Sequence, residues 1–146
     1  MGDLSKDFSK SELTCKCGCG LFIKSAQLVS LLQKIRDAMG RSITVTSGTR
    51  CTLHNKRVKG VTAKTTIPTK GAPGEPKDSN HTHGTAADIV CSGMIADALW
   101  IHVRSMYKKG RLPELAGLGR YDSFCHVDVD PKVPGHLREW DDREKR

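Results

Sequence analysis

The spacing of apolar residues predicts a helix over residues 25–40. Its apolar side chains recur at intervals of three and four residues, which places them on one face of a helix. They are Leu28, Leu31, Leu32, Ile35 and Met39. Ser25 stands where an N-terminal cap belongs, and Gly40 stands where a C-terminal cap belongs. We therefore expect one stripe of this helix to be buried in a core.

A second helix is predicted over residues 93–110, with Gly110 at its end. The residues expected to face the core are Ile95, Leu99, Val103 and Met106. Nearer the N-terminus, Ser9 and Glu12 have the spacing of a capping box, which indicates a brief helix.

Strands are predicted where apolar residues alternate or form short runs. Residues 42–46 alternate, and residues 85–91 form a short apolar run typical of a buried strand. Residues 118–121 and 124–130 indicate a closing pair of strands. Helices that precede and interrupt a set of strands favour the α+β class. The expected fold is a small single domain with a central antiparallel sheet flanked by helices.

Two segments show no periodicity. Residues 59–79 are rich in Gly, Pro, Lys and Thr and are predicted to form a long loop, which in a compact domain is usually functional or mobile. Residues 136–146 are highly charged, and we expect the chain to fray beyond Trp140. The predicted domain therefore spans residues 1–140, followed by a charged tail over residues 141–146.

Composition and charge limit the possible partners. The 146 residues suit one domain, and the formal charge of +8 predicts attraction to polyanions such as nucleic acid, anionic membranes or the bacterial cell wall. Aromatic residues make up only 5% of the chain and do not alternate with basic ones, which argues against nucleic acid. No run is apolar enough for a membrane span, and the N-terminus lacks the apolar region of a secretory signal. We expect a monomer made in the cytoplasm without a signal peptide.

The stretch SNHTHGTAADIV contains two residues of chemical interest, His81 and Asp88. A histidine and an aspartate at this spacing are weak evidence by themselves. However, Asp88 lies just inside an apolar strand, and a buried carboxylate is costly unless it is paired or bound to a cation. The pair is either part of a metal site that needs a third ligand, or a turn histidine and an aspartate held by backbone amides.

The stretch FCHVDVD offers a third ligand. Successive side chains alternate along a strand, so His126 and Asp128 share one face while the two valines favour the core on the other. Two imidazoles, one carboxylate and an open fourth position form a catalytic zinc arrangement. The predicted ligands are His81, Asp88 and His126, with Asp128 as the general base. The alternative is a surface strand with an ordinary polar face.

Six cysteines are unusual in a chain without a signal sequence. Four of them could bind a structural zinc ion, although the C-x-C-x-C spacing differs from the usual C-x2-C. These four are Cys15, Cys17, Cys19 and Cys51. Disulfides formed after release from the cell, or reduced thiols, are the alternatives. Cys91 and Cys125 are expected to be buried free thiols.

Three motifs occur in one order along the chain: SGTR at residues 47–50, SNHTHGTAAD at 79–88 and HVD at 126–128. Together they resemble the zinc D-alanyl-D-alanine peptidases, a group related to lysostaphin and the hedgehog signalling domain. The stretches LTCKCGCG, VTSGTRCTLHN and GRYDSFCHVDV resemble a small phage and bacterial branch of that group. The resemblance implies a hedgehog/D-Ala-D-Ala-peptidase-like fold and a peptidase that acts on peptidoglycan stem peptides.

The resemblance also implies a role for each matching residue. His81, Asp88 and His126 correspond to the zinc ligands. Arg50 corresponds to a residue that pairs with a substrate carboxylate, for which its planar guanidinium group is suited. Ser79 is expected to hydrogen-bond the substrate or to brace its loop.

The chain departs from the family pattern in two places. Many members carry an acidic residue three positions before the last ligand, or a histidine two positions before it, whereas this chain has Ser123 and Phe124. Asp128 is therefore the expected base, and Asp122, which has the same strand parity, is the second choice. The long loop before Ser79 is expected to border the cleft and to affect which stem peptide fits.

The expected function is zinc-dependent hydrolysis of a stem peptide at the cell wall, as in a phage or prophage endolysin. If Arg50 holds a C-terminal carboxylate, the enzyme is a D,D-carboxypeptidase. If it holds the α-carboxylate of D-glutamate, the enzyme is an L-alanyl-D-glutamate endopeptidase. The alternatives are a zinc-containing wall-binding module without turnover and, more distantly, a nucleic-acid-binding protein with a cysteine-rich zinc knuckle.

Overall fold

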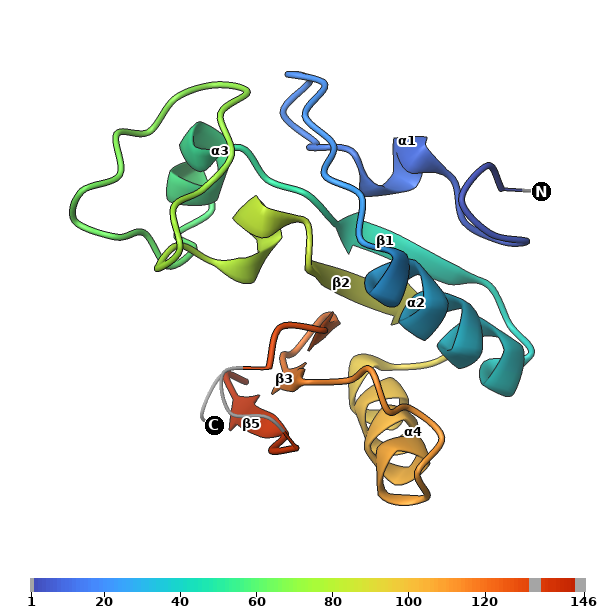
Figure 1. Cartoon of the computed structure of the whole chain (residues 1–146). Helices are drawn as coiled ribbons and strands as arrows, with labels where there is room; N and C mark the ends of the chain where they lie inside the picture. The colour runs from blue at the N-terminus through green and yellow to red at the C-terminus, as the bar shows by residue number, and fades with distance from the viewer. Residues whose placement is uncertain (1, 132–134, 144–146) are drawn as a thin grey trace.

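A computed structural model describes residues 2–131 and 135–143 of the chain (Figure 1). Its α-helices are α1 (Lys10–Leu13), α2 (Ala26–Met39), α3 (Thr52–Arg57) and α4 (Ala96–Lys108), and a short 3-10 helix, η1, covers Asn80–His83. Its strands are β1 (Ile43–Ser47), β2 (Ala86–Cys91), β3 (Gly117–Arg120), β4 (Cys125–Asp128) and β5 (Arg138–Asp141). None of the helices in these residues is long and apolar enough to span a membrane.

The five described strands form one sheet in the order β1-β2-β4-β3-β5. The neighbours among the first four are antiparallel, which confirms the predicted antiparallel centre and the closing pair β3 and β4. The edge strand β5 pairs with β3 in the parallel direction, so the complete sheet is mixed. The expected small α+β domain is confirmed.

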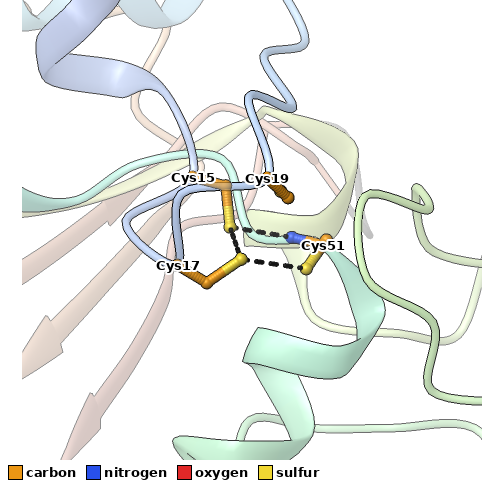
Figure 2. A group of neighbouring side chains, drawn as sticks. All are labelled: Cys15, Cys17, Cys19 and Cys51. Carbon is orange, nitrogen blue, oxygen red and sulfur yellow. Dashed lines mark hydrogen bonds between the residues drawn. The ribbon is translucent and has the colours of Figure 1, made fainter.

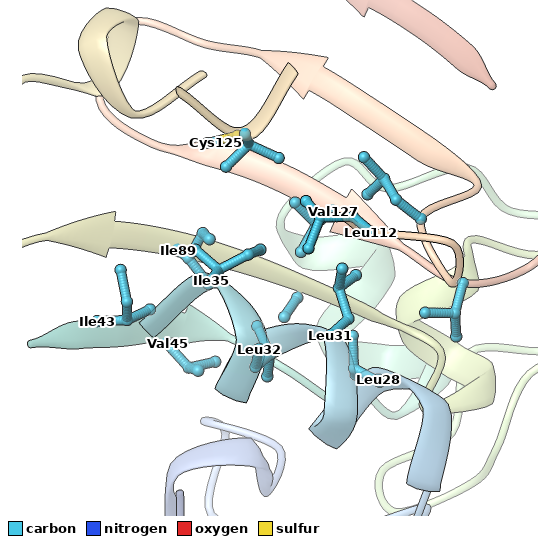
Figure 3. Close-up of a cluster of buried hydrophobic side chains, with 14 of the residues drawn as sticks. Leu28, Leu31, Leu32, Ile35, Ile43, Val45, Ile89, Leu112, Cys125 and Val127 are labelled. Atoms are coloured by element: carbon cyan, nitrogen blue, oxygen red, sulfur yellow. The ribbon is translucent and has the colours of Figure 1, made fainter. Parts of the chain in front are cut away.

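Helix α2 forms as its sequence predicts. The Ser25 hydroxyl accepts a hydrogen bond from the Leu28 amide at 3.2 Å, and Gly40 ends the helix in the left-handed conformation. Figure 3 shows the apolar stripe of α2 directed toward the strands, opposite Ile43, Val45 and Ile89. Burial of this stripe against one face of the sheet makes the core and leaves the other face for polar residues.

The prediction for α4 is wrong at its first turn. Periodicity places Ile95 toward the core, but Ile95 is the N-cap residue and is 73% exposed. Leu99, Val103 and Met106 are buried as predicted. The apolar stripe therefore begins one turn later, because Ile95 still has the extended backbone conformation that precedes the helix.

The C-terminal segment is also more ordered than expected. Strand β5 includes Asp141, and the amide of Asp142 donates to the Arg120 carbonyl at 2.8 Å. The Arg143 guanidinium lies 3.2 Å from the Asp97 carboxylate at the start of α4. The expected fraying beyond Trp140 is therefore wrong for residues 141–143, while residues 144–146 lie outside the described part of the chain.

Residues 59–79 form the predicted long loop, which lies with α3 at the opposite end of the molecule from α4 (Figure 1). Buried Asp78 holds this loop together, since its carboxylate accepts 2.7 Å hydrogen bonds from the amides of Ala63 and Glu75. Burial alone would raise the pKa of Asp78, but these amides and the Thr66 hydroxyl lower it. An ionised carboxylate therefore gives an otherwise irregular segment a defined path toward Ser79.

The contrast between Ile95 and Leu99 can be tested by a pair of alanine substitutions. Leu99 is 0% exposed, so Leu99→Ala should lower the free energy of unfolding by about 2–5 kcal/mol. Ile95→Ala should change it by less than about 0.5 kcal/mol, because it removes exposed atoms and keeps the backbone bond from the Leu99 amide to the Ile95 carbonyl. Chemical denaturation of both variants measures the difference. Equal losses would show that the first turn packs as the sequence suggested.

Candidate metal centre

The predicted metal ligands come together on the face of the sheet opposite the core. Asp88 on β2 is the direct cross-strand partner of His126 on β4, and His81 is supplied by η1 just before β2. One ligand atom from each of the three residues lies within 4.8 Å of the others, and all three side chains are buried. Strand pairing and a short helical turn therefore create the predicted triad.

The Asp88 carboxylate lies between the two imidazoles. Its Oδ1 atom is 3.3 Å from Nε2 of His81 and 3.1 Å from Nδ1 of His126. Burial opposes ionisation of Asp88, but its contacts with His126 and His81 lower its pKa. Three potential ligand atoms of the kinds that zinc prefers therefore face one point.

Each imidazole is oriented by a bond at its other nitrogen. Nδ1 of His81 is 2.8 Å from the Gly48 carbonyl, an acceptor, so Nδ1 carries the proton and the lone pair of Nε2 faces Asp88. Nε2 of His126 is 2.9 Å from the Asp128 carboxylate, which leaves Nδ1 of His126 facing Asp88. Carbonyl or carboxylate partners of this kind are typical of zinc-binding histidines. The donor set and its orientation fit a zinc ion.

The two histidines differ in their affinity for protons. Burial lowers the pKa of His81, which favours the neutral imidazole that a metal requires. Burial also disfavours charge on His126, but the carboxylates of Asp128 and Asp88 outweigh that effect and raise its pKa. A metal ion must therefore compete with a proton at His126, so its binding should weaken as the pH falls.

Asp128 lies behind His126, away from the point where the three ligand atoms meet. It is 0% exposed, and its two oxygens bind Nε2 of His126 and the Arg138 guanidinium. The carboxylate occupies the space beside Gly117, where the β-carbon of any larger residue would collide with Asp128 Oδ2. The sequence placed Asp128 beside the metal, whereas the structure places it where it can orient a ligand.

An aromatic wall covers the outer side of the triad. The Trp140 ring on β5 lies 4.9 Å from the His126 ring, and its Nε1 donates to the Tyr121 hydroxyl at 2.9 Å. Tyr121 in turn stacks on Phe124 with 4.3 Å between ring centroids. Gly119 leaves room for the indole, because a β-carbon there would come within 2.6 Å of it. No local sequence pattern indicates this wall, since it depends on where β5 joins the sheet.

A cavity of about 310 Å³ opens over the triad. All three candidate ligands line it, together with the predicted substrate residues Arg50 and Ser79, and with Tyr121 and Asp142. Its size is near the lower end of the usual range for ligand pockets, which suits a short segment of a substrate. Lys59, Gly60 and Val61 of the long loop also line it, as expected of a loop that borders the cleft.

Arg50 is held in place by three neighbours. Its Nε donates to Ser47, Nη1 to Asn55 and Nη2 to Asp88 Oδ2 at 3.1 Å. Arg50 thus binds the carboxylate oxygen that does not face the histidines. A guanidinium group has five N–H donors, so these three bonds within the described residues leave two, one on each terminal nitrogen. These two N–H groups remain to bind a substrate carboxylate.

Ser79 caps η1, since its hydroxyl accepts a hydrogen bond from the His81 amide at 3.3 Å. The serine therefore braces the turn that carries the first ligand, which is one of its two expected roles. Asp122, the second candidate for a base, is exposed and does not belong to the cavity lining. Asp142 is the cavity-lining carboxylate, besides Asp88, within the described part of the chain.

Comparison with known proteins identifies one related family. The family model described as Peptidase M15 matches residues 6–128 of the chain. The matched region includes the three candidate ligands, Arg50 and Ser79, but it ends before β5. No curated protein and no solved structure matches the chain significantly.

The position of Asp128 generates a prediction about metal affinity. Asp128→Asn keeps the shape of the side chain but removes the charge that orients His126, so zinc affinity should fall by about 10–100-fold. Competition with a chromogenic chelator measures this affinity, and Asp122→Asn is the matched control on the exposed surface. If Asp128→Asn bound zinc normally and lost only turnover, Asp128 would be the base that the sequence suggested.

Proposed function

The chain belongs to the peptidase M15 family, and on that basis we propose that it hydrolyses a peptide bond in the stem peptides of bacterial peptidoglycan. Membership implies a zinc metallopeptidase with a peptidoglycan-type substrate. The observation that carries the proposal is the buried triad, in which two imidazole nitrogens and one carboxylate oxygen face one point beneath a cavity.

In the proposed enzyme, His81, Asp88 and His126 hold the zinc ion. When bound, zinc polarises the scissile carbonyl and lowers the pKa of water at the site. Arg50 neutralises Asp88 from the far side, and Asp128 keeps His126 in the orientation that binding requires. Trp140 and Tyr121 shield one side of the site and limit the approach of bulk water.

Arg50 is the proposed anchor for the substrate. Its two remaining N–H donors can receive a carboxylate in the cavity, and its three existing bonds keep the guanidinium fixed. A C-terminal carboxylate at this position corresponds to D,D-carboxypeptidase activity, and the α-carboxylate of D-glutamate corresponds to L-alanyl-D-glutamate endopeptidase activity. Either bond fits the proposal that the chain serves as a phage or prophage endolysin, and the formal charge of +8 favours adsorption to an anionic wall.

We assign the general base to Asp142 in place of Asp128. Asp128 is fully buried and bonded at both oxygens, whereas Asp142 is exposed and lines the cavity. Asp142 is also a neighbour of Tyr121 in the cavity wall, since burial and the carboxylates of Asp142 and Asp88 together raise the pKa of Tyr121. In the proposed mechanism, Asp142 accepts a proton from the attacking water and passes it to the leaving amine.

The first test is release of peptides from purified peptidoglycan. We expect new amino groups and soluble fragments, loss of both on addition of a chelator, and loss of both in His126→Ala. The fragment masses identify the bond, because cleavage by a carboxypeptidase releases D-alanine and cleavage by the endopeptidase frees the D-glutamate amino group. A chain that binds zinc and wall but releases nothing would instead be a wall-binding module, the alternative raised by the replacement of the usual base position with Ser123.

The second test separates the candidate bases. Asp142→Asn should lower kcat by about 10²–10⁴-fold while zinc affinity is unchanged, because the residue lines the cavity but is not a proposed ligand. Asp122→Asn removes a carboxylate that does not line the cavity and should leave kcat near its original value. Steady-state kinetics on the released stem peptide, with zinc content measured in parallel, checks both variants. Normal turnover by Asp142→Asn would remove Asp142 from the mechanism.

A further inference from the structure

Four cysteines from two distant parts of the chain meet beside the Arg50 turn. Cys15, Cys17 and Cys19 lie in the loop between α1 and α2, and Cys51 caps the start of α3. Figure 2 shows these side chains gathered around a common centre, with the loop on one side and the first turn of α3 on the other. All four sulfurs lie within 4.8 Å of one another, and none forms a disulfide in the described structure.

We propose that Cys15, Cys17, Cys19 and Cys51 bind a structural zinc ion, separate from the ion of the histidine site. The proposal concerns the stability of the fold around Arg50 and does not depend on peptidase activity. Four thiolates that surround one ion leave no position open for water, as is typical of a structural zinc site.

The sulfur positions have the dimensions of a zinc tetrathiolate. A zinc–sulfur bond is about 2.3 Å long, so the sulfurs at the corners of a tetrahedron are roughly 3.8 Å apart. The sulfurs of Cys15 and Cys17 are 3.5 Å apart, and those of Cys17 and Cys51 are 3.7 Å apart. The chain therefore already holds these sulfurs near the separation that the ion requires.

Backbone amides also point at the sulfurs. The Cys51 amide lies 3.4 Å from the sulfur of Cys15, the Leu21 amide lies 3.4 Å from that of Cys19, and the His54 amide lies 3.4 Å from that of Cys51. An N–H group that points at sulfur favours the thiolate, which is the form that binds metal. The sulfurs of Cys15, Cys19 and Cys51 each have such a partner.

The loop that carries three of the cysteines has a backbone suited to this role. Gly18 and Gly20 both have positive φ angles, 87° and 83°. A residue with a side chain would adopt these angles only with strain. The Cys15 amide donates to the Leu21 carbonyl at 2.9 Å and closes the loop. These two turns bring Cys17 and Cys19 back toward Cys15, so the unusual C-x-C-x-C spacing is compatible with a single centre.

The site would connect the N-terminal segment to the residue proposed to bind substrate. Cys51 follows Arg50 directly, and the Thr49 amide already donates to the Leu13 carbonyl at 2.8 Å. A zinc ion on the four sulfurs would make a second link between the same two segments. Arg50 would then be fixed both by its bond to Asp88 and by the zinc ligand next to it in the chain, Cys51.

The decisive experiment uses His126→Ala, in which the histidine site is disabled. Purified from a reducing medium, this variant should still contain one zinc ion per chain, and X-ray absorption should show only sulfur neighbours at about 2.3 Å. Wild-type protein should contain one further ion, with nitrogen and oxygen neighbours. The readout is metal content and coordination, so it does not depend on hydrolysis of any substrate.

Two cysteine variants complete the test. Cys17→Ser, at a half-buried member of the cluster, should remove the sulfur-bound zinc, whereas Cys91→Ser changes a core thiol outside the cluster and should retain it. The proposal is overturned if folded His126→Ala contains no zinc, or if its zinc has nitrogen or oxygen neighbours. It is also overturned if mass spectrometry finds the four cysteines joined in disulfides, with the loss of two hydrogens per bond.

Discussion

The buried carboxylate of Asp88 is the constraint on which the polar half of this domain depends. An ionised carboxylate inside a core strand is costly unless cations or hydrogen-bond donors surround it. Here the His126 ring contacts one oxygen, the Arg50 guanidinium binds the other, and the neutral His81 ring lies beside the first. Every element near the site contributes to that requirement: η1 brings one histidine, β4 brings the other, and the turn after β1 brings the arginine. A bound cation would satisfy the same requirement with greater strength.

The two faces of strand β4 serve different purposes, one in the apolar core and the other in the polar site. Cys125 and Val127 face the apolar core, while His126 and Asp128 lie on the opposite face, where His126 joins the candidate metal centre. Because side chains alternate along a strand, a shift of one residue in register would exchange the two sets. Pairing with β2 and β3 on both sides fixes the register, so the packing of the core also determines the position of a ligand.

The sequence predicted what local patterns determine. Residues His81, Asp88 and His126 could be grouped because strand parity and a known motif both selected them, and the structure brings them together. The exact position of Asp128 was not predictable, because parity gives the face of a side chain but not which ring nitrogen it contacts. Trp140 and Asp142 were missed because their positions depend on β5, whose parallel pairing with β3 no local sequence pattern indicates. Ile95 was misplaced because periodicity does not locate the first turn of a helix.

The edge position of β5 has a consequence for motion. This strand pairs only with β3 among the described strands and is the last of them along the chain, yet it carries the indole that covers His126. Edge and terminal elements open locally at a smaller free-energy cost than the core requires to unfold. Detachment of β5 would uncover the metal ligands while α2, α4 and the central strands remain packed. If the three residues hold an ion as proposed, its exchange with solvent can follow the local opening of one short strand, on a timescale separate from that of global unfolding.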